Sequence, residues 1–378
     1  MKFFHISDLH LGIRVGGYQM LDDQRYILTE IIRLALEHKP DAVAIAGDVY
    51  DKSVPTVEAV ELLDWFVVSL NELGVAVYLV AGNHDSTERI SFASSLLGKS
   101  DVHISQSYKG SLSPIRTQDE YGEVNVWLMP YLKPSVVRQH FQGLEIASYS
   151  DAVSAALSNI EIDSKKRNVL VAHQFVTGAI TSESDELYVG GSENVDASLF
   201  DSFDYVALGH LHRPQNIKRQ TLRYSGTPLK YSLSEADHNK TVTLVEMKGK
   251  GETVISELPL SPSRDMREIR GTYKELTAQK NYLGTNTDDY VYICLTDEDE
   301  EPDAATKLRN IYPNLVRLRY DNARTQAKMT EIATTSYDSK EPVDLFGEFY
   351  EMQNGQPMSE AQRKYSQNLL KKIWEGRA

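Results

Sequence analysis

Five short clusters of Asp, His and Asn residues constrain this chain more than any other feature of its 378 residues. Each cluster follows an apolar run of strand character, such as AVAIA before Gly47 or NVLVA before His173. In chain order the clusters are Asp8-Leu9-His10, Gly47-Asp48, Gly82-Asn83-His84, His173 and Gly209-His210-Leu211-His212. In open α/β sheets ligands gather at the carboxyl ends of the strands, so five strands that end in this way can bring these side chains together.

The number and type of these side chains predict a site for two metal ions. Apart from His84, the clusters supply four His, two Asp and one Asn, which is too many ligands for one ion and suits two ions that share a carboxylate. Two ions about 3.5 to 4 Å apart clamp the attacking and leaving oxygens of a displacement at phosphorus. Asp48 is the expected bridge, because the preceding glycine allows a tight turn. Imidazoles and carboxylates without a thiolate suit manganese, iron or catalytic zinc.

Each cluster taken alone has a simpler explanation. An isolated D-x-H or H-x-H is most often a turn or a hydrogen-bonded histidine, and an isolated G-N-H is most often a turn. The placement of all five clusters directly after strand-like runs favours one shared metal site over five unrelated turns.

The series D-x-H, G-D-x-x-D, G-N-H-D, H and G-H-x-H resembles the calcineurin-like metallophosphoesterases, which include phosphatases, nucleotidases and nucleases. More narrowly, the segments ISDLHLG, GHLHRPQ and YSGTPLKYSLSEADHNK resemble the SbcD family, the nuclease subunits of bacterial SbcC/SbcD complexes. This resemblance covers essentially the whole chain.

The resemblance implies a role for each residue of the site. It implies two Mn²⁺ ions, one held by Asp8, His10, Asp48 and His212, and the other by Asp48, Asn83, His173 and His210. His84 is no ligand in this scheme and is expected to stabilise charge on the phosphate and to protonate the leaving oxygen. Asp51 is expected either to orient His84 or to cap the helix that follows it.

The function that the resemblance implies is metal-dependent hydrolysis of DNA phosphodiester bonds. It would act as a double-strand exonuclease and a single-strand or hairpin endonuclease in DNA repair, recombination and replication. The alternative is a phosphomonoesterase or cyclic-nucleotide phosphodiesterase, because the same two metals serve all of these reactions. A third hypothesis, a non-catalytic DNA tether or an activator of a partner ATPase, is disfavoured by the complete ligand set and His84.

Alternating strand and helix patterns predict an α/β fold, a two-sheet β-sandwich with flanking helices, over residues 1–262. A proline-rich joint at 259–263 predicts a domain boundary. Residues 263–335 are expected to form a small α+β capping domain, and by resemblance this domain helps to shape the DNA entrance.

The remaining segment, residues 341–378, is predicted to form a C-terminal tail of two helices. The first helix has its apolar residues at Leu345, Phe346, Phe349 and Tyr350. A capping box at 359–362 opens the second, which carries Tyr365, Leu369 and Trp374. This aromatic density favours docking onto a partner over packing on the chain's own surface. By resemblance the partner is an SbcC-like ATPase, and the sequence lacks a G-x-x-x-x-G-K-[ST] loop of its own.

Composition limits the partners and the compartment. With 40 Lys+Arg against 54 Asp+Glu, the net charge of −14 has the wrong sign for broad neutralisation of DNA phosphates, so basic clusters such as 165–167 are expected to be solvated faces. The single cysteine, Cys294, and the lack of a long apolar run predict a cytoplasmic protein without a membrane span. The resemblance also implies a homodimer within a heterotetramer, formed through helices between about 55 and 100, with contacts at Phe92, Leu96 and Leu97.

Overall fold

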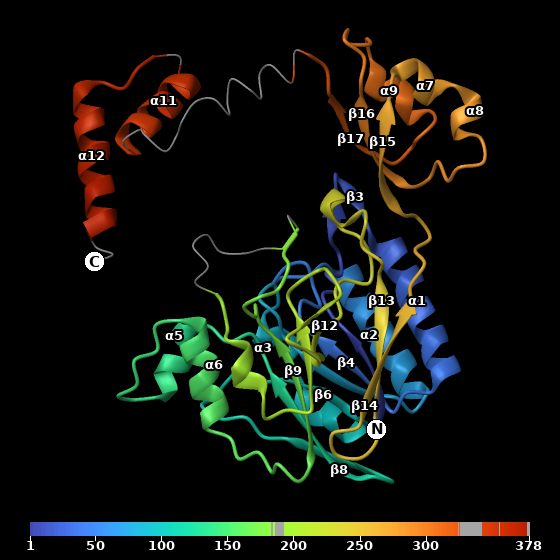
Figure 1. Cartoon of the computed structure of the whole chain (residues 1–378), viewed down its shortest axis with the longest axis vertical. Helices are drawn as coiled ribbons and strands as arrows, with labels where there is room; N and C mark the ends of the chain where they lie inside the picture. The colour runs from blue at the N-terminus through green and yellow to red at the C-terminus, as the bar shows by residue number, and fades with distance from the viewer. Residues whose placement is uncertain (183, 186–192, 324, 326–341, 355, 376–378) are drawn as a thin grey trace.

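The computed structural model describes all residues except 183, 186–192, 324, 326–341, 355 and 376–378. Its main body is a sandwich of two six-stranded sheets (Figure 1), with the orders β14-β13-β1-β4-β5-β6 and β11-β12-β10-β9-β8-β7. The strands of the first sheet are β1 (Lys2–Ile6), β4 (Ala42–Ala46), β5 (Ala76–Val80), β6 (Val102–Ile104), β13 (Thr241–Met247) and β14 (Thr253–Pro259). Those of the second are β7 (Ile115–Asp119), β8 (Gly122–Met129), β9 (Arg167–His173), β10 (Tyr205–Gly209), β11 (Gln215–Ile217) and β12 (Arg219–Tyr224). The predicted two-sheet sandwich is confirmed.

The central strands of both sheets are parallel. In the first sheet β1, β4, β5 and β6 run in one direction, and in the second β8, β9, β10 and β12 do. His173 at the end of β9 contacts the main-chain oxygen of Ala46 at the end of β4, with a separation of 2.9 Å from Nδ1. The carboxyl ends of both sets of strands therefore meet at the same edge of the sandwich.

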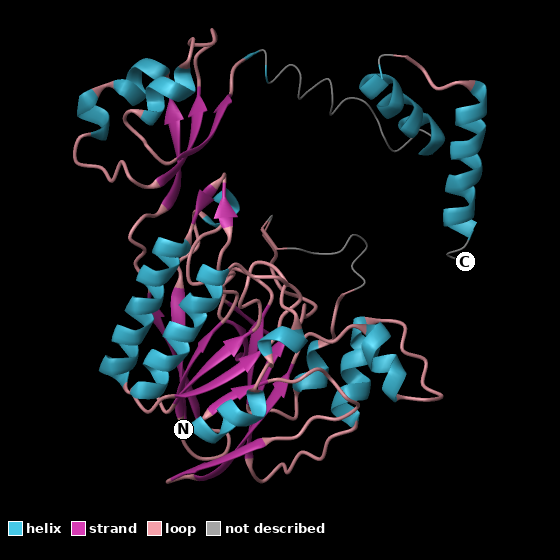
Figure 2. Cartoon of the chain, turned by 180° about the vertical axis from the view of Figure 1, so that it is seen from behind, coloured by secondary structure: helices cyan, strands magenta, loops and turns pink. Residues whose placement is uncertain are grey.

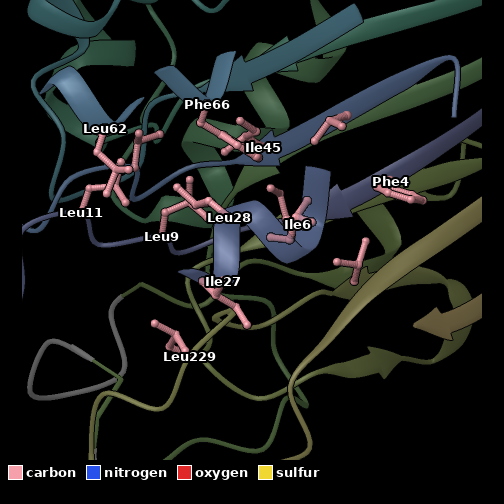
Figure 3. Packing of buried hydrophobic residues seen from close by; sticks show 14 of the residues in the cluster. Phe4, Ile6, Leu9, Leu11, Ile27, Leu28, Ile45, Leu62, Phe66 and Leu229 are labelled. Atoms are coloured by element: carbon pink, nitrogen blue, oxygen red, sulfur yellow. The ribbon is translucent and has the colours of Figure 1, made fainter. Parts of the chain in front are cut away.

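The inner strands β4, β9 and β10 are buried along their whole length, because both faces of each sheet are covered there. Between the sheets, side chains such as Phe3 and Tyr78 meet Val171 and Tyr205. The helices α1 (Leu21–His38) and α2 (Val57–Glu72) cover the outer face of the first sheet, and α5 (Pro134–Val137) and α6 (Tyr149–Ser158) cover that of the second (Figure 2). Figure 3 shows the layer between the first sheet and the helices α1 and α2, in which Phe4, Ile6, Leu28, Ile45 and Phe66 lie together. Complete burial of one such side chain contributes roughly 1.5 to 3 kcal/mol.

Short elements connect the layers. The hairpin β2 (Arg14–Val15) and β3 (Tyr18–Gln19) precedes α1, and the helices α3 (Thr87–Ile90) and α4 (Ser94–Leu97) follow β5. Phe92 and Leu96 in this region are 81% and 65% exposed, whereas Leu97 is partly buried against the chain's own core. Of the three residues predicted as dimer contacts, Phe92 and Leu96 are therefore exposed, whereas part of the Leu97 side chain already packs inside the chain.

A small α/β module follows the sandwich. It contains a parallel sheet of β15 (Met266–Gly271), β16 (Tyr290–Leu295) and β17 (Leu315–Tyr320), covered on one face by α7 (Tyr273–Thr277), α8 (Gln279–Tyr282) and α9 (Ala304–Arg309). The buried carboxylate of Asp23 on α1 fastens the module to the sandwich. It accepts hydrogen bonds of 2.9 and 2.6 Å from the Arg264 guanidinium and of 2.8 Å from the Tyr290 hydroxyl.

The predicted C-terminal helices are present as α11 (Pro342–Asn354) and α12 (Glu360–Glu375). The predicted capping box is confirmed, because the Gln362 amide oxygen accepts from the Ser359 main-chain N–H at 2.9 Å and Ser359 Oγ accepts from the Gln362 N–H at 3.3 Å. The two helices contact each other through the Arg363–Asp344 ion pair and stand clear of the sandwich in both views (Figures 1 and 2). The side chain of Trp374 lies outside the described residues.

Two predictions about single residues are wrong. Asp51 does not cap a helix, because α2 begins at Val57 and its N-cap is Thr56, whose hydroxyl accepts from the Ala59 N–H at 3.3 Å. Arg167 is not part of a solvated face, because its guanidinium is 2% exposed and donates to the Asp119 carboxylate at 2.8 Å. Among the described helices, none is long and apolar enough to cross a membrane.

Candidate metal centre

The five clusters converge at the common carboxyl edge of the two sheets. Asp8 and Asp48 lie just after β1 and β4, and the main-chain N–H of Asp8 donates to the Gly47 oxygen at 3.0 Å. Asn83 follows β5, His173 ends β9, and the main-chain N–H of His210, after β10, donates to the Asp8 carboxylate at 3.0 and 3.2 Å. The predicted convergence from all five strands is therefore present.

Asp48 occupies the centre of the group. Its Oδ2 atom lies 3.2 Å from His173 Nε2 and 3.9 Å from Nε2 of both His10 and His84. Its Oδ1 atom accepts a hydrogen bond of 2.9 Å from the main-chain N–H of His84. One carboxylate thus faces ligand atoms from both sheets, as a bridging ligand must.

Two ligand groups overlap at Asp48. The ligand atoms of Asp48, His173 and His210 lie within 4.8 Å of one another, as do those of His10, Asp48 and His84. Asn83 belongs with the first group, since its Oδ1 atom lies 2.9 Å from His173 Nε2 and 3.0 Å from His210 Nδ1.

Of the remaining predicted ligands, His212 lies beside the second group, whereas Asp8 Oδ1 lies 3.9 Å from His173 Nδ1 in the first group. The ring centroids of His10 and His212 are 5.1 Å apart, and those of His10 and His84 are 4.8 Å apart. The second group therefore contains His84 together with His10 and Asp48, two of the residues predicted to hold that ion.

Several of these residues have a strained backbone. Asp8, His10, Asp48 and His210 have φ angles of 53°, 43°, 47° and 111°, in the left-handed region that side chains rarely adopt. Each such residue costs of order 1 to 3 kcal/mol, and this strain collects at functional sites. At Gly82, an added Cβ would overlap the Asp48 carboxylate, so only glycine permits this approach of the two loops.

Buried atoms without partners test whether the site fits a cation. Both ring nitrogens of His10 and Nε2 of His210 are buried and have no hydrogen-bond partner within the described ranges. Leaving a buried polar atom unsatisfied costs about 1 to 3 kcal/mol. Lone pairs on neutral imidazoles next to a carboxylate are suitable ligands for a divalent transition metal, so the residues fit such an ion.

The comparisons with known proteins agree with this geometry. Residues 1–214 match the family model described as Calcineurin-like phosphoesterase. Residues 262–354 match a model named SbcD_C and described as Type 5 capsule protein repressor C-terminal domain. The SbcD subunit of the nuclease SbcCD from Staphylococcus epidermidis is 32% identical over 374 residues, which cover 98% of each chain. This chain belongs to the SbcD family of calcineurin-like phosphoesterases.

Two solved structures are also similar to this SbcD-family chain. They are a dimetal phosphatase from Danio rerio, at 11% identity, and a protein of Thermus thermophilus, at 12% identity. Each match covers 68% of this chain and 98% of the other, with a TM-score of 0.39. The similarity is too low to support a functional comparison.

The electrostatics of the SbcD-family site separate its imidazoles into two kinds. Burial lowers the pKa of His10 and of His210 to about 3, so both are neutral and ready to bind a cation. Burial also lowers the pKa of His173, but the Asp48 carboxylate outweighs this effect and raises it to about 9. The pKa of Asp48 is held below its usual range, because His173 outweighs the opposing effect of burial.

His84 is oriented by the main chain of Asp51. Its Nδ1 atom lies 2.9 Å from the Asp51 carbonyl oxygen. The carbonyl can only accept, so Nδ1 carries a proton and Nε2 is the atom on the side of Asp48. This carbonyl accepts the Nδ1–H hydrogen bond, so the main chain of Asp51 contributes to the orientation of the His84 ring.

One carboxylate that the sequence analysis did not assign joins two of the loops. Asp85 accepts hydrogen bonds of 2.9 Å from the Gly82 N–H, 3.1 Å from the Val49 N–H and 3.0 Å from the Tyr50 N–H. It thereby fixes the loop of Asp48 against the loop of Asn83. Its place directly after His84 was the only indication in the sequence.

Proposed function

We propose that this chain is a two-metal DNA nuclease that acts as the nuclease subunit of a complex with an SbcC-like ATPase. The observation that carries the proposal is the pair of ligand groups that share Asp48, at the mouth of the sandwich of an SbcD-family chain. We further propose three units: a nuclease domain (1–262), a capping domain (263–335) and docking helices (341–378).

The proposed cofactors are two Mn²⁺ ions. One is assigned to Asp8, His10, Asp48 and His212, and the other to Asp48, Asn83, His173 and His210. When bound, the ions supply a positive clamp for the attacking and leaving oxygens of the phosphodiester. Manganese suits this imidazole-rich set, whereas magnesium prefers oxygen ligands and water.

His84 is proposed to act on the substrate. With Nδ1 held by the Asp51 carbonyl, its Nε2 atom lies 3.9 Å from Asp48 and faces the same space as the ligand atoms. As an imidazolium it stabilises charge on the phosphate and gives its Nε2 proton to the leaving sugar oxygen.

A basic cleft supports a polymeric substrate over a mononucleotide. A cavity of about 670 Å³ lies between the loop that follows β10 and the uncovered face of the capping sheet, and its lining includes Arg213, Arg317 and Arg319. Arg213 directly follows His212. In the part of the chain that the structure describes, the guanidinium groups of Arg213 and Arg317 have no ion-pair or hydrogen-bond partner. Cationic side chains in a cleft that begins next to a proposed metal ligand suit phosphates on either side of the scissile bond.

The exposed apolar residues support the proposed partners. Phe346, Phe349 and Leu369 on the C-terminal helices are 44%, 54% and 48% exposed, which suits docking onto the ATPase. Phe92 and Leu96 suit contacts of a homodimer within a heterotetramer. The proposed complex is cytoplasmic and acts in DNA repair, recombination and replication.

The direct test is an assay of the purified chain on linear duplex, hairpin and plasmid DNA and on mononucleotides. We expect DNA cleavage with Mn²⁺, much slower cleavage with Mg²⁺ and none in EDTA. Asp48→Asn is the control for a contaminating nuclease. Hydrolysis of mononucleotides without cleavage of DNA would support the phosphomonoesterase alternative instead.

The cleft has a separate test. Arg213→Ala and Arg317→Ala should each weaken DNA binding and reduce the slope of log affinity against log salt concentration by about 1. Arg33→Ala on the outer surface of α1 is the matched control, since Arg33 is already paired with Glu30 and Glu37. Equal salt dependence in all three variants would exclude the cleft as the DNA path.

A further inference from the structure

A buried network of polar side chains contacts His212. Glu235 is fully buried and Lys240 is 5% exposed. Glu235 Oε1 lies 3.0 Å from His212 Nδ1, and Glu235 Oε2 accepts from Lys240 Nζ at 2.6 Å and from the Thr227 hydroxyl at 3.1 Å. Lys240 Nζ also donates to Thr227 Oγ1 at 2.5 Å and to the His212 carbonyl at 2.9 Å. The network therefore holds His212 by both its ring and its main chain.

Stability alone does not explain this network. A buried Lys–Glu pair must lose its hydration, and apolar side chains of similar size are often equally stable in its place. Both members of the Lys240–Glu235 pair also contact the same candidate ligand, His212. This points to a role in orienting the imidazole of that ligand.

The two sides of the metal centre differ in how an imidazole is held. His173 Nδ1 lies within hydrogen-bond distance of a neutral acceptor, the Ala46 carbonyl, at 2.9 Å, and the Asp8 carboxylate is farther away at 3.9 Å. His212 Nδ1 faces the carboxylate of Glu235 instead. A carboxylate acceptor fixes the tautomer more firmly and makes the opposite nitrogen a stronger electron donor to a metal.

We propose that Glu235 is a positioning residue for the metal position that includes His212. Glu235 keeps a proton on His212 Nδ1, leaves Nε2 to bind the ion and strengthens binding at that position only. Lys240 and Thr227 in turn hold the Glu235 carboxylate in place. This inference rests on the proposed two-metal site. It means that a carboxylate orients His212 at one metal position, whereas a main-chain carbonyl orients His173 at the other.

The test is titration of the metal-free full-length chain with Mn²⁺ in a calorimeter. The wild-type chain should bind two ions. Glu235→Gln should weaken one of them by about 10- to 100-fold, the usual effect of changing a residue that orients a ligand, and leave the other unchanged. Glu37→Gln on the exposed surface of α1 removes the same charge and should have no effect on either ion.

A double variant separates orientation from stability. Glu235→Leu with Lys240→Met replaces both partners by apolar groups, so the metal-free chain should keep a melting temperature near that of the wild type. It should still lose the one ion selectively. In the neutral form, nitrogen NMR should show His212 mainly as the Nδ1–H tautomer in the wild type and as a mixture of the Nδ1–H and Nε2–H tautomers in this variant.

The outcomes distinguish this inference from the proposed function. Two ions bound with wild-type affinities by Glu235→Gln would overturn the role of Glu235, as would equal weakening of both ions. If the double variant does not fold, Glu235→Gln alone decides. A wild-type chain that binds no Mn²⁺ would overturn the proposed function itself, and this inference with it.

Discussion

The metal centre and the C-terminal helices are incomplete in opposite ways. At the metal centre, ring nitrogens of His10 and His210 are buried and have no hydrogen-bond partner among the residues that the structure describes. On the helices, apolar side chains are exposed, with Phe349 at 54% and Tyr365 at 71%. The first arrangement is stabilised by a cation and the second by an apolar surface. Under the proposed function, the first region therefore binds ions and the second binds a macromolecule.

The two regions also differ in how firmly they are held. The ligand loops are tied together by buried side chains such as Asp85 and by the ends of two sheets. The helices α11 and α12 hold each other through exposed pairs, including Gln362 Nε2 to the Tyr350 hydroxyl at 3.0 Å. Changes in the first region should alter catalysis, and changes in the second should alter assembly alone.

The largest effect is expected for Asp48→Ala. Because Asp48 faces ligand atoms of both groups, its removal should empty both metal positions and reduce DNA cleavage by at least about 10³-fold, the scale on which charge-stabilising groups act. Metal analysis of the dialysed variant checks the first point and a nuclease assay the second. Retention of two ions would show that the carboxylate does not bridge them.

His84→Ala should separate catalysis from metal binding. If His84 acts on the phosphate, cleavage falls by on the order of 10² to 10³-fold while two ions remain bound. The distinction matters because His84 lies as close to Asp48 as His10 does. An ion missing from this variant would identify His84 as a ligand.

Metal affinity should rise with pH. The pKa of His173 is raised to about 9 in the metal-free chain, so at neutral pH an ion must displace its proton. Apparent Mn²⁺ affinity should then increase about tenfold per pH unit between pH 6 and 8, with about one proton released per chain. Calorimetry in buffers of different ionisation enthalpy measures this release. An affinity that does not change over this range would contradict the ion pair.

The smallest effect on catalysis is expected from deletion of residues 341–378. Metal-dependent cleavage by the isolated chain should stay within about twofold, because α11 and α12 lie apart from the sandwich whose strands carry the candidate ligands (Figure 1). Association with an SbcC-like ATPase should be lost, since each buried aromatic or leucine side chain contributes roughly 1.5 to 3 kcal/mol before ordering costs. Co-purification is the measurement.

Point substitutions test whether exposed aromatic side chains of the C-terminal helices, and not exposed aromatic residues in general, bind the ATPase. Phe346→Ala with Phe349→Ala should reproduce the loss of association, whereas Tyr26→Ala, at an exposed aromatic on α1, should not. A truncated chain that still binds the ATPase would mean that the interface lies elsewhere.

Much of the molecule could be predicted because the information is local. The five apolar runs became strands where expected, since strands covered on both faces are continuously apolar. The capping box at Ser359 also formed, because its hydrogen bonds lie within four residues. The convergence of the five clusters could be predicted because the strand ends of a parallel sheet share one edge.

What the sequence determined by itself was the set of strands and the residue types placed at their ends, because periodicity and turns are properties of neighbouring residues. Only the tertiary structure decided which distant groups support them. Glu235 and Lys240 contact His212 although they lie more than twenty residues away in the sequence, and no helix or strand pattern in the sequence indicates these contacts. Arg167 is buried because β9 brings it next to Asp119 on the margin of the sheet. Such contacts depend on how the layers stack, and stacking is fixed by the packing of the whole core.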